Sequence, residues 1–470
     1  MGTARNVLLI TVDQWSAAYA GYEGHPAVIT PSLDMLSQTG VRYPNAYSEC
    51  PVCVPARRTW MTGLHPCAHG ALDNCGMPMP QGVPTLAQCF RDRGYQAHAV
   101  GKLHVNPQRD RIGFDEVLLD EEGRGGPDDY ALWLADHGHA GERYHNAMGN
   151  NQYEWRPWHL EERLHPTAWA TRQMARCIQR RDPTRPNFWY LSYSCPHPPI
   201  VPPRDYLDMY RDMPIPMPAV GAWVEQAPRI DEKERRRREG LMRAYFAQCT
   251  YIDHQLRLVI GTLREEGLLH DTVICFTADH GEQLGAHGEW AKGSFLEHSA
   301  RVPFLLLGAM EDERFQPGGV DERLVGQEDL LPTLLDAAGL APAEHATGCS
   351  VLSTEPRREV FGIFSTIERG GWRGPSRMLR SDEAKLIWYP QGNRVQLFDM
   401  QNDRDELHDL ADDPASAACR ADLERRLIER LPPDERSRWV SDGRLCACEP
   451  PPATGSMTAV IRGLYNQRGL

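Results

Sequence analysis

Short, continuous apolar runs alternate with longer amphipathic stretches along most of the chain. Continuous apolar runs are typical of strands that a parallel sheet buries on both faces, whereas apolar residues three or four positions apart indicate a helix with one buried side. The runs that predict strands are 6–12, 96–100, 188–194, 272–278 and 301–307. The helical patterns cover 31–40, 84–93, 167–181, 233–266 and 329–339. This alternation predicts an α/β fold with a large, mostly parallel sheet sandwiched by helices.

The pattern changes near residue 373. Three short strand-like segments follow in succession and precede one helical pattern, at 377–381, 384–389, 395–399 and 418–430. Strands that follow one another this closely favour a small antiparallel sheet, which the helix would cover. We therefore expect an α/β domain at 1–373, a C-terminal subdomain at 374–448 and an extended tail at 449–470. The proline-rich tail is either disordered or an oligomerisation arm that bridges subunits.

Residues 105–160 show no clear periodicity and are dense in Trp, Tyr and His. We interpret them as long loops over a site, where the faces of Trp133, Tyr153 and Trp155 would hold an aryl group or a cation. The alternative is that these aromatic side chains form a subunit contact in a homo-oligomer.

Composition limits the possible partners. The 470 residues carry a formal net charge of −13, which argues against a general nucleic-acid binder, so the arginine run at 235–238 is interpreted as a solvated helix face. Thirteen irregularly spaced cysteines suit free thiols in a reducing compartment. The first apolar run has no basic segment before it and no cleavage site after it, and no run approaches the ~20 residues of a membrane span. We expect a soluble, cytoplasmic protein with no membrane partner.

Polar and charged residues follow the predicted strands. They are Asp13 and Gln14, Lys102 and His104, His197, and Asp279 and His280. One such residue is usually a turn or cap residue, but parallel strands bring their carboxyl ends to the same edge of the sheet, where ligands bind. Together these residues predict one site at that edge.

The stretch 51–63 contains Cys53, Pro55 and Arg57 in a Cys-x-Pro-x-Arg pattern. Proline is tolerated in a first helical turn, and Gly63 is a natural stop, so Cys53 is expected at the start of a short helix. Unpaired N–H groups there favour negative charge. A buried, inert cysteine is the alternative. Cys50 and Cys53 also form a CxxC pair, but no second pair follows at zinc-site spacing.

This stretch resembles the signature of the sulfatases, a branch of the alkaline phosphatase superfamily in which the motif's cysteine is oxidised to formylglycine. The glycine-punctuated loop 281–293, which carries Lys292, is similar to the family's second signature, and 402–414 resembles the loop that closes its C-terminal subdomain. The resemblance implies catalytic roles for Cys53, Arg57, Lys102, His104, His197 and Lys292. It implies substrate contacts for Lys102, His197, Lys292 and Asn74, and one divalent cation at Asp13, Gln14, Cys53, Asp279 and His280.

Two positions depart from the commonest sulfatase pattern, in which the two metal-binding pairs are Asp-Asp and Asp-Asn. Here Gln14 replaces a carboxylate and His280 adds an imidazole, a combination that resembles choline sulfatases and phosphonate monoester hydrolases. The smaller negative charge and the nitrogen ligand indicate Mn²⁺ or Ca²⁺ more than Mg²⁺.

The resemblance implies a sulfuric ester hydrolase of the arylsulfatase type, acting on an organic sulfate monoester through hydrated formylglycine. One hydroxyl of the hydrate would attack sulfur, and His104 would take the proton of the other to release sulfate. His197 and Lys292 would protonate or shield the leaving oxygen. The alternatives are a phosphonate monoester or phosphodiester hydrolase with the same site, and a non-catalytic binding protein. Further partners would be a formylglycine-generating maturase and other copies of the chain, and an aromatic or uncharged leaving group is expected over a polyanionic glycan.

Overall fold

An eight-stranded sheet forms the centre of the molecule, with strand order β5-β4-β6-β1-β7-β8-β2-β9. The structure is a computed structural model that describes residues 5–74, 76–144, 147–224, 230–309, 312–365 and 375–447. The strands are β1 (Asn6–Asp13), β2 (Val41–Arg42), β4 (Gln96–Gly101), β5 (Glu116–Leu119), β6 (Asn187–Pro196), β7 (Thr272–Ala278), β8 (Phe304–Leu307) and β9 (Gly319–Val320). Only β8 runs against its neighbours, so the prediction of a large, mostly parallel sheet is confirmed.

The central strands β1, β6 and β7 are buried along their whole length. Ile10 of β1 lies between Leu191 of β6 and Phe276 of β7 in the parallel register. Continuous apolar sequence is what such a position requires, since both faces of these strands are covered. The three strands therefore form a rigid platform whose carboxyl ends meet at one edge.

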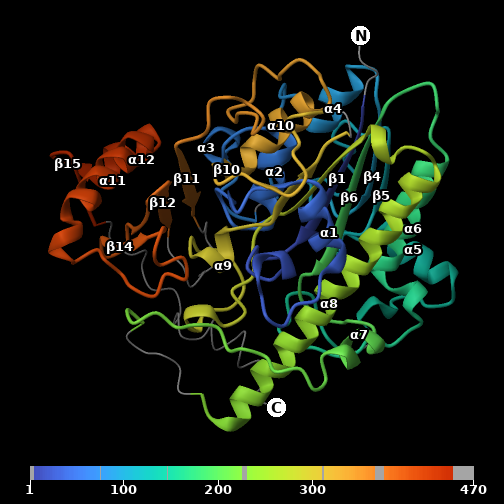
Figure 1. The fold of residues 1–470 in the computed structure, drawn as a ribbon, viewed down its shortest axis with the longest axis horizontal. Coiled ribbons are helices and arrows are strands. Elements are labelled where there is room, and N and C mark those ends of the chain that lie inside the picture. Colours follow the sequence, from blue (N-terminus) through green and yellow to red (C-terminus); the bar gives the residue numbers. More distant parts are fainter. Residues whose placement is uncertain are drawn as a thin grey trace.

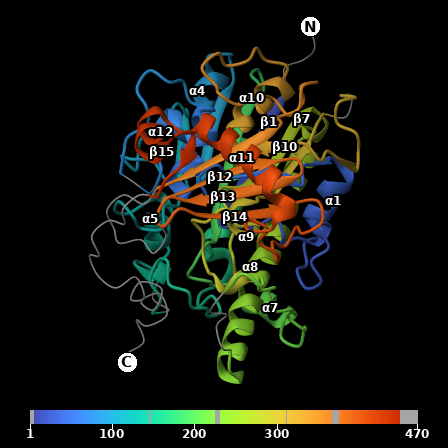
Figure 2. The same cartoon turned by 90° about the vertical axis from the view of Figure 1, so that its left-hand side faces the viewer.

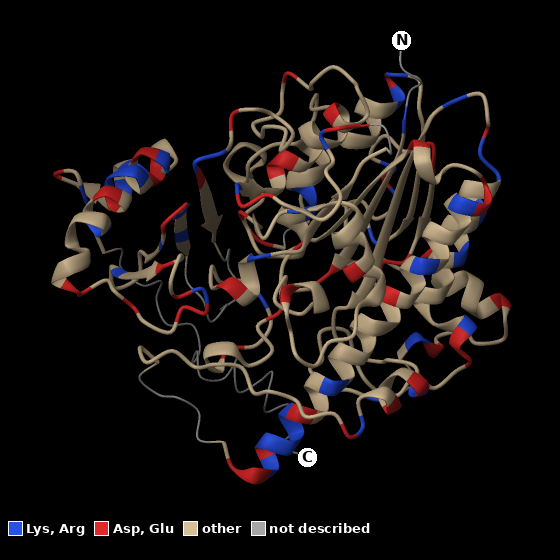
Figure 3. Cartoon of the chain, viewed as in Figure 1, with Lys and Arg blue, Asp and Glu red and all other residues tan. Residues whose placement is uncertain are grey.

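Helices cover both faces of the sheet (Figure 1). One face carries α1 (Pro31–Thr39), α6 (Pro166–Gln179) and α8 (Glu232–Glu265), and the other carries α2 (Cys53–Thr62), α4 (Leu86–Arg91) and α10 (Leu330–Ala337). Charged residues of both signs gather at the N-terminal end of α8 (Figure 3). Arg235 there pairs with Glu232 and Glu239 of the same helix, as expected of a solvated face.

A four-stranded antiparallel sheet forms the smaller domain, on the left in Figure 1 and in front in Figure 2. Its strands are β11 (Glu359–Phe364), β12 (Ser376–Ser381), β13 (Ala384–Tyr389) and β14 (Arg394–Asp399), and α11 (Ala417–Arg430) packs against it. The predicted antiparallel sheet and helix are confirmed. The predicted boundary at 373/374 is wrong, because β11 precedes it and pairs with β12 along its whole length. The predicted tail at 449–470 lies outside the described residues.

Shorter elements complete the chain. They are α3 (Pro66–His69), α5 (Asp129–Asp136), α7 (Arg204–Met209), α9 (Glu297–Ala300), α12 (Pro433–Trp439), β3 (Asn45–Tyr47), β10 (Leu324–Gly326), β15 (Val440–Ser441) and β16 (Arg444–Leu445). Within the described ranges, no helix has the length and apolar character needed to cross a membrane. The eleven cysteines in these ranges are free thiols.

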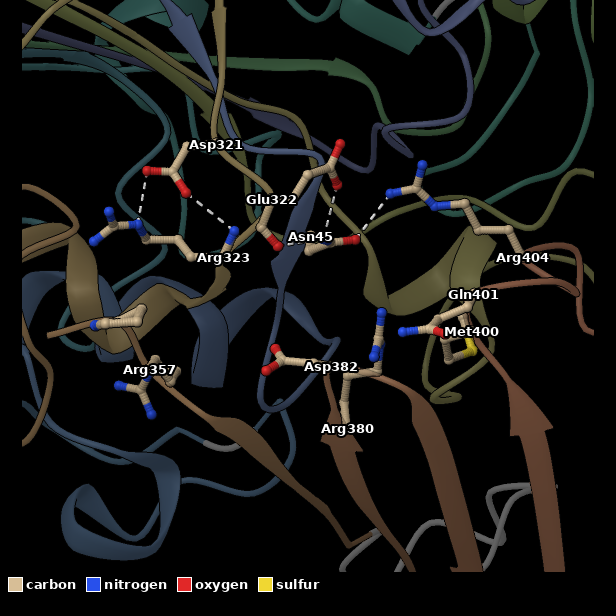
Figure 4. A pocket seen from close by; sticks show the side chains of 11 residues that line it. Asn45, Asp321, Glu322, Arg323, Arg357, Arg380, Asp382, Met400, Gln401 and Arg404 are labelled. Carbon is tan, nitrogen blue, oxygen red and sulfur yellow. Dashed lines mark hydrogen bonds and ion pairs between the residues drawn. The ribbon is translucent and has the colours of Figure 1, made fainter. Parts of the chain in front are cut away.

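The two domains meet through buried charges. Lys385 of β13 pairs with Glu297 of α9 at 2.6 Å and with Glu406 at 2.5 Å, and the Lys385 side chain is fully buried. A polar pocket of about 670 Å³ also lies at this junction, lined by residues of both domains (Figure 4). Arg404 on one side of it donates to Asn45 Oδ1 on the other at 2.8 Å. None of the predicted catalytic or metal-binding residues lines this pocket.

The segment 105–160 is more regular than its sequence indicated. It contains the edge strand β5 and the helix α5, whose first turn is capped by Asp128 through a hydrogen bond from the Ala131 N–H. Trp133 stacks on Tyr130, a fully buried core residue. The interpretation as long loops is therefore wrong for this part of the segment. Short elements at a sheet edge carry too few residues for a clear period.

Candidate active site

The carboxyl ends of β1 and β7 bring Asp13, Gln14, Asp279 and His280 together. The pairing of β1 with β6 shifts register at Asp13, and Gln14 has a positive φ of 70°, so the chain turns sharply out of the sheet here. Asp279 Oδ1 accepts hydrogen bonds from the backbone N–H groups of Gln14 and His280, each at 3.0 Å. These bonds fix the Asp279 carboxylate beside its neighbours from the adjacent strand.

Cys53 is the first residue of α2, as expected, and its thiol joins this group. The ligand atoms of Asp13, Cys53, Asp279 and His280 all lie within 4.8 Å of one another, and all four residues are buried. Cys53 Sγ is 3.2 Å from His280 Nε2 and 3.8 Å from Asp13 Oδ1. The other ring nitrogen of His280, Nδ1, is 3.0 Å from the Gly281 carbonyl oxygen and so donates to it, which leaves the Nε2 lone pair facing the cluster. The arrangement fits a divalent cation.

Three cations surround this cluster. Lys292 Nζ lies 3.0 Å from Cys53 Sγ and 2.7 Å from Gln14 Oε1. Arg57 Nε donates to Asp279 Oδ2 at 2.9 Å, and Lys102 Nζ lies 2.5 Å from Asp13 Oδ2. Arg57 and Lys102 are almost completely buried, whereas the Lys292 side chain keeps 15% of its surface exposed. Arg57 and Lys102 thus neutralise the carboxylates, and Lys292 is the more accessible charge.

These charges change the ionisation of the site. Burial alone would raise the pKa of Asp13, but the positive charges around it, led by Lys102, hold that pKa well below its ordinary value. Burial and Asp13 also act to raise the pKa of the Cys53 thiol, yet nearby cations, Lys292 first among them, bring it below its ordinary value. The site therefore favours negative charge on the Asp13 oxygens and at position 53.

Glu122 links two of the predicted residues and was missed from the sequence. Its carboxylate lies 2.6 Å from Lys102 Nζ and 3.2 Å from His197 Nδ1. Burial would raise the pKa of Glu122, but Lys102 and other cations hold it well below its ordinary value. Glu122 follows the edge strand β5, and the same rule of polar residues after strand ends would have found it if β5 had been recognised.

His104 and Asn74 lie further out. Arg124 Nη1 donates to His104 Nε2 at 2.9 Å, and burial with the charge of Lys102 places the pKa of His104 well below its ordinary value. Asn74 is exposed, and its Oδ1 accepts from the Val54 N–H at 3.0 Å, at the N-terminus of α2. The structure thus places Arg57, Lys102 and Lys292 around the predicted metal residues. Glu122 connects His197 to Lys102, and Arg124 connects His104 to Glu122. Asn74 lies beside the turn that leads into Cys53.

Comparison with known proteins identifies the family. The sulfatase family model matches residues 5–340, and a model of the N-sulphoglucosamine sulphohydrolase C-terminal region matches 285–431. An arylsulfatase of Clostridium perfringens is 30% identical over 467 residues, covering 93% of this chain and 96% of its own. The chain belongs to the sulfatase family. The predicted recognition and the predicted activity, that of a sulfuric ester hydrolase, are confirmed.

A choline-sulfatase and phosphonate monoester hydrolases, the two kinds of protein that the Gln14 and His280 pair resembles, are also similar to this sulfatase. A choline-sulfatase of Rhizobium meliloti is 30% identical over 460 residues, covering 89% of this chain and 84% of its own. The phosphonate monoester hydrolase of Silicibacter pomeroyi is structurally similar with a TM-score of 0.75 and 25% identity, covering 93% of this chain and 96% of its own. The phosphonate monoester hydrolase of Agrobacterium radiobacter has a TM-score of 0.77 at 23% identity. The match covers 95% of this chain and 100% of its own, and it supports the fold.

The amide of Gln14 has a defined orientation in this sulfatase. Its Nε2 donates to the Glu282 carboxylate and to the Tyr153 hydroxyl, and Tyr153 also donates to Glu282 at 2.6 Å. Two acceptors on Nε2 direct Oε1 toward Lys292 and the metal-binding cluster, where an oxygen rather than an N–H group is needed. Glu282 was not among the predicted site residues, and Tyr153 was predicted only as an aromatic face over the site, because nothing local marks a partner of Gln14.

Glu282→Ala is expected to weaken metal binding by about 10- to 100-fold, because the released amide can present its N–H groups to the cation. Tyr153→Phe, which removes one acceptor and keeps the ring, is the milder variant and should weaken binding less. Titration of metal-free protein with Mn²⁺ measures both. Equal affinities in the wild type and in Glu282→Ala would show that Gln14 needs no such support.

Proposed function

We propose that this sulfatase hydrolyses an organic sulfate monoester through formylglycine formed from Cys53, with a divalent cation held by Asp13, Asp279 and His280 and by the amide oxygen of Gln14. The observation that carries the proposal is the position of Cys53 Sγ. It lies 3.2 Å from His280 Nε2 and 3.0 Å from Lys292 Nζ, at the centre of a buried set of metal-ligating atoms. In this unmodified form, Sγ stands for the oxygens that the aldehyde hydrate would present.

The donor set supports one hard cation with a nitrogen ligand. Two carboxylates, one imidazole and one amide oxygen suit Mn²⁺ or Ca²⁺ better than Mg²⁺, which demands near-ideal octahedral oxygen geometry. When bound, the cation would supply Lewis-acid charge at position 53. The hydrated aldehyde would supply a nucleophilic oxygen and a second hydroxyl whose deprotonation permits release of sulfate.

The chain's own residues then have separate tasks. Lys292 places a positive charge next to position 53, where it can stabilise the oxygens of an anionic ester as charge develops on them. Arg57 and Lys102 hold the carboxylates of Asp279 and Asp13 in place, and Lys292 is the most exposed of the three charges.

The two histidines suit proton transfer and shielding. The low pKa of His104 keeps its imidazole neutral near pH 7, and its Nε2 could take a proton once the Arg124 N–H that it now accepts moves away. Burial, together with the charge of Lys292, lowers the pKa of His197 to about 4, while Glu122 opposes that shift. His197 is therefore neutral in the free protein, and its first task is to shield the leaving oxygen. The negative charge of a bound ester would favour its protonation.

The conversion of Cys53 is tested by producing the protein together with a formylglycine-generating maturase. Mass spectrometry of the peptide between Arg42 and Arg57 should show CH₂SH replaced by CHO at position 53, in proportion to arylsulfatase activity. Cys50→Ser, three residues away, should leave the conversion unchanged, and Cys53→Ala should abolish both the signal and turnover. Full activity from protein whose Cys53 is unmodified would refute the proposal.

Phosphonate monoester or phosphodiester hydrolysis is the second candidate. The specific support is the Gln14 and His280 pair together with the likeness to the Silicibacter pomeroyi phosphonate monoester hydrolase. Both kinds of ester present one negative charge on a tetrahedral centre, so the same site can accept either. Measured kcat/KM for an aryl sulfate, an aryl phosphonate monoester and a phosphodiester should be highest for the sulfate. A phosphonate value above the sulfate value would reverse the order of the two candidates.

A further inference from the structure

A second cluster of metal-ligating side chains lies toward the β5 edge of the sheet. His98 of β4, Glu116 of β5 and Cys177 of α6 place one ligand atom each within 4.8 Å of one another. His98 Nδ1 is 3.5 Å from Glu116 Oε2. No function assigned above to this sulfatase involves these three residues.

The fold itself creates this juxtaposition. His98 and Glu116 are direct partners in the parallel pairing of β4 with β5, so their side chains leave the sheet on the same face. Helix α6 packs against β4 and brings Cys177, near its C-terminal end, over that face. Because 79 and 61 residues separate Cys177 from the other two positions (177 − 98 and 177 − 116), no short motif in the sequence signals this cluster.

The imidazole of His98 is unusual because its nitrogens make no hydrogen bond within the described residues, although Nδ1 lies 3.5 Å from the Glu116 carboxylate. Both ring nitrogens are buried, and neither has a hydrogen-bond partner within the described part of the chain. A buried polar atom without a partner costs free energy, and such atoms are rare in folded proteins. The Glu116 side chain beside it is 58% exposed, so the cluster can be reached from solvent.

We propose that His98, Glu116 and Cys177 form a binding site for Zn²⁺, with water as the fourth ligand. Imidazole nitrogen, thiolate sulfur and carboxylate oxygen are the three donors that Zn²⁺ takes in proteins, and a bound cation would satisfy one of the orphaned nitrogens of His98. Binding forms the sulfur–zinc bond and releases the thiol proton of Cys177 to solvent.

This site is separate from the catalytic cluster. His98 lies on β4, and Lys102 directly follows that strand four residues later, a distance of about 13 Å at the rise of a β-strand. It is nevertheless connected to catalysis, since β5 leads from Glu116 into Glu122, which holds Lys102 and His197. Zinc would join the edge strand to β4 and α6 and so hold the segment that carries Glu122. The inference goes beyond the proposed hydrolase function and does not depend on it.

The experiment uses full-length protein with Cys53→Ala, so that the active-site thiol contributes no metal–sulfur signal. Metal-free protein is titrated with Co²⁺, whose thiolate complexes absorb in the near ultraviolet, and then with Zn²⁺, with a thermal unfolding scan at each step. We expect a thiolate–cobalt band that Zn²⁺ removes and a rise in Tm on adding Zn²⁺. Cys177→Ser should abolish the band and weaken zinc binding by at least about 100-fold.

Two further variants make the result decisive. Cys419→Ser removes an exposed thiol outside the cluster and should leave the band and the zinc-dependent Tm unchanged. Glu116→Gln alters an exposed side chain, so it should fold normally and still weaken zinc binding. A band that survives Cys177→Ser, the absence of any band in the Cys53→Ala protein, or equal zinc affinity in Glu116→Gln would each overturn the proposal.

Discussion

Asp279→Ala is expected to lose the bound metal and to lower kcat/KM by at least about 10³-fold, the upper range for removing one stabilising group from an active site. Asp279 is one of only two carboxylates in the cluster, so the variant halves its anionic charge. It also removes the acceptor of Arg57 Nε and of the Gln14 and His280 backbone N–H groups. Metal content by elemental analysis and turnover of an aryl sulfate measure the two effects.

The control for this prediction is Asp253→Asn. Asp253 is also fully buried, but its carboxylate accepts from the N–H groups of Ser32 and Leu33 at the start of α1. That variant should lose stability and keep both its metal and its kcat. Asp279→Asn, which keeps the volume of the side chain, separates loss of charge from a cavity. Metal retained at full occupancy in a folded Asp279→Ala protein would contradict the assignment of Asp279 as a ligand.

Glu122→Ala is expected to lower the free energy of unfolding by about 3–5 kcal/mol, the cost of leaving a buried charge without one of its partners. The Lys102 side chain is fully buried and pairs with Glu122 and Asp13, so its ammonium would keep one carboxylate. Activity should fall as well, since Glu122 also holds His197. Urea unfolding with a matched aryl sulfate assay measures both quantities. Glu161→Ala, at an exposed pair with Arg163, is the control and should change the stability little.

The contribution of Glu122 to the free energy of unfolding should decrease as the pH falls. Its pKa in the folded protein is well below the ordinary value of 4.5, so the ionised form stabilises the fold. That contribution is complete above pH 4.5 and is lost as the pH falls through the pKa of the folded protein. Glu122→Gln, which cannot ionise, should therefore approach the wild type in stability as the pH falls below 4.5. A difference that stays constant between pH 7 and pH 3 would contradict this account.

The sequence alone determined the main features of this sulfatase. Continuous apolar runs identified β1, β4, β6 and β7, because strands buried on both faces admit few polar residues. The residues just after those strands, with the Cys-x-Pro-x-Arg stretch, predicted a cluster that the structure brings together, and they indicated the family. These are local signals, and each lies within a dozen residues of chain.

The tertiary structure alone decided which side chains serve as partners. Glu122 reaches Lys102, Glu282 reaches Gln14, and His98 meets Cys177, all across elements whose relative position depends on helical crossovers between strands. The edge strand β5 and the strand β11 also emerged only from their pairing. Periodicity records which face of an element is buried but carries no information about what lies against it, so contacts between distant charges cannot be obtained from it.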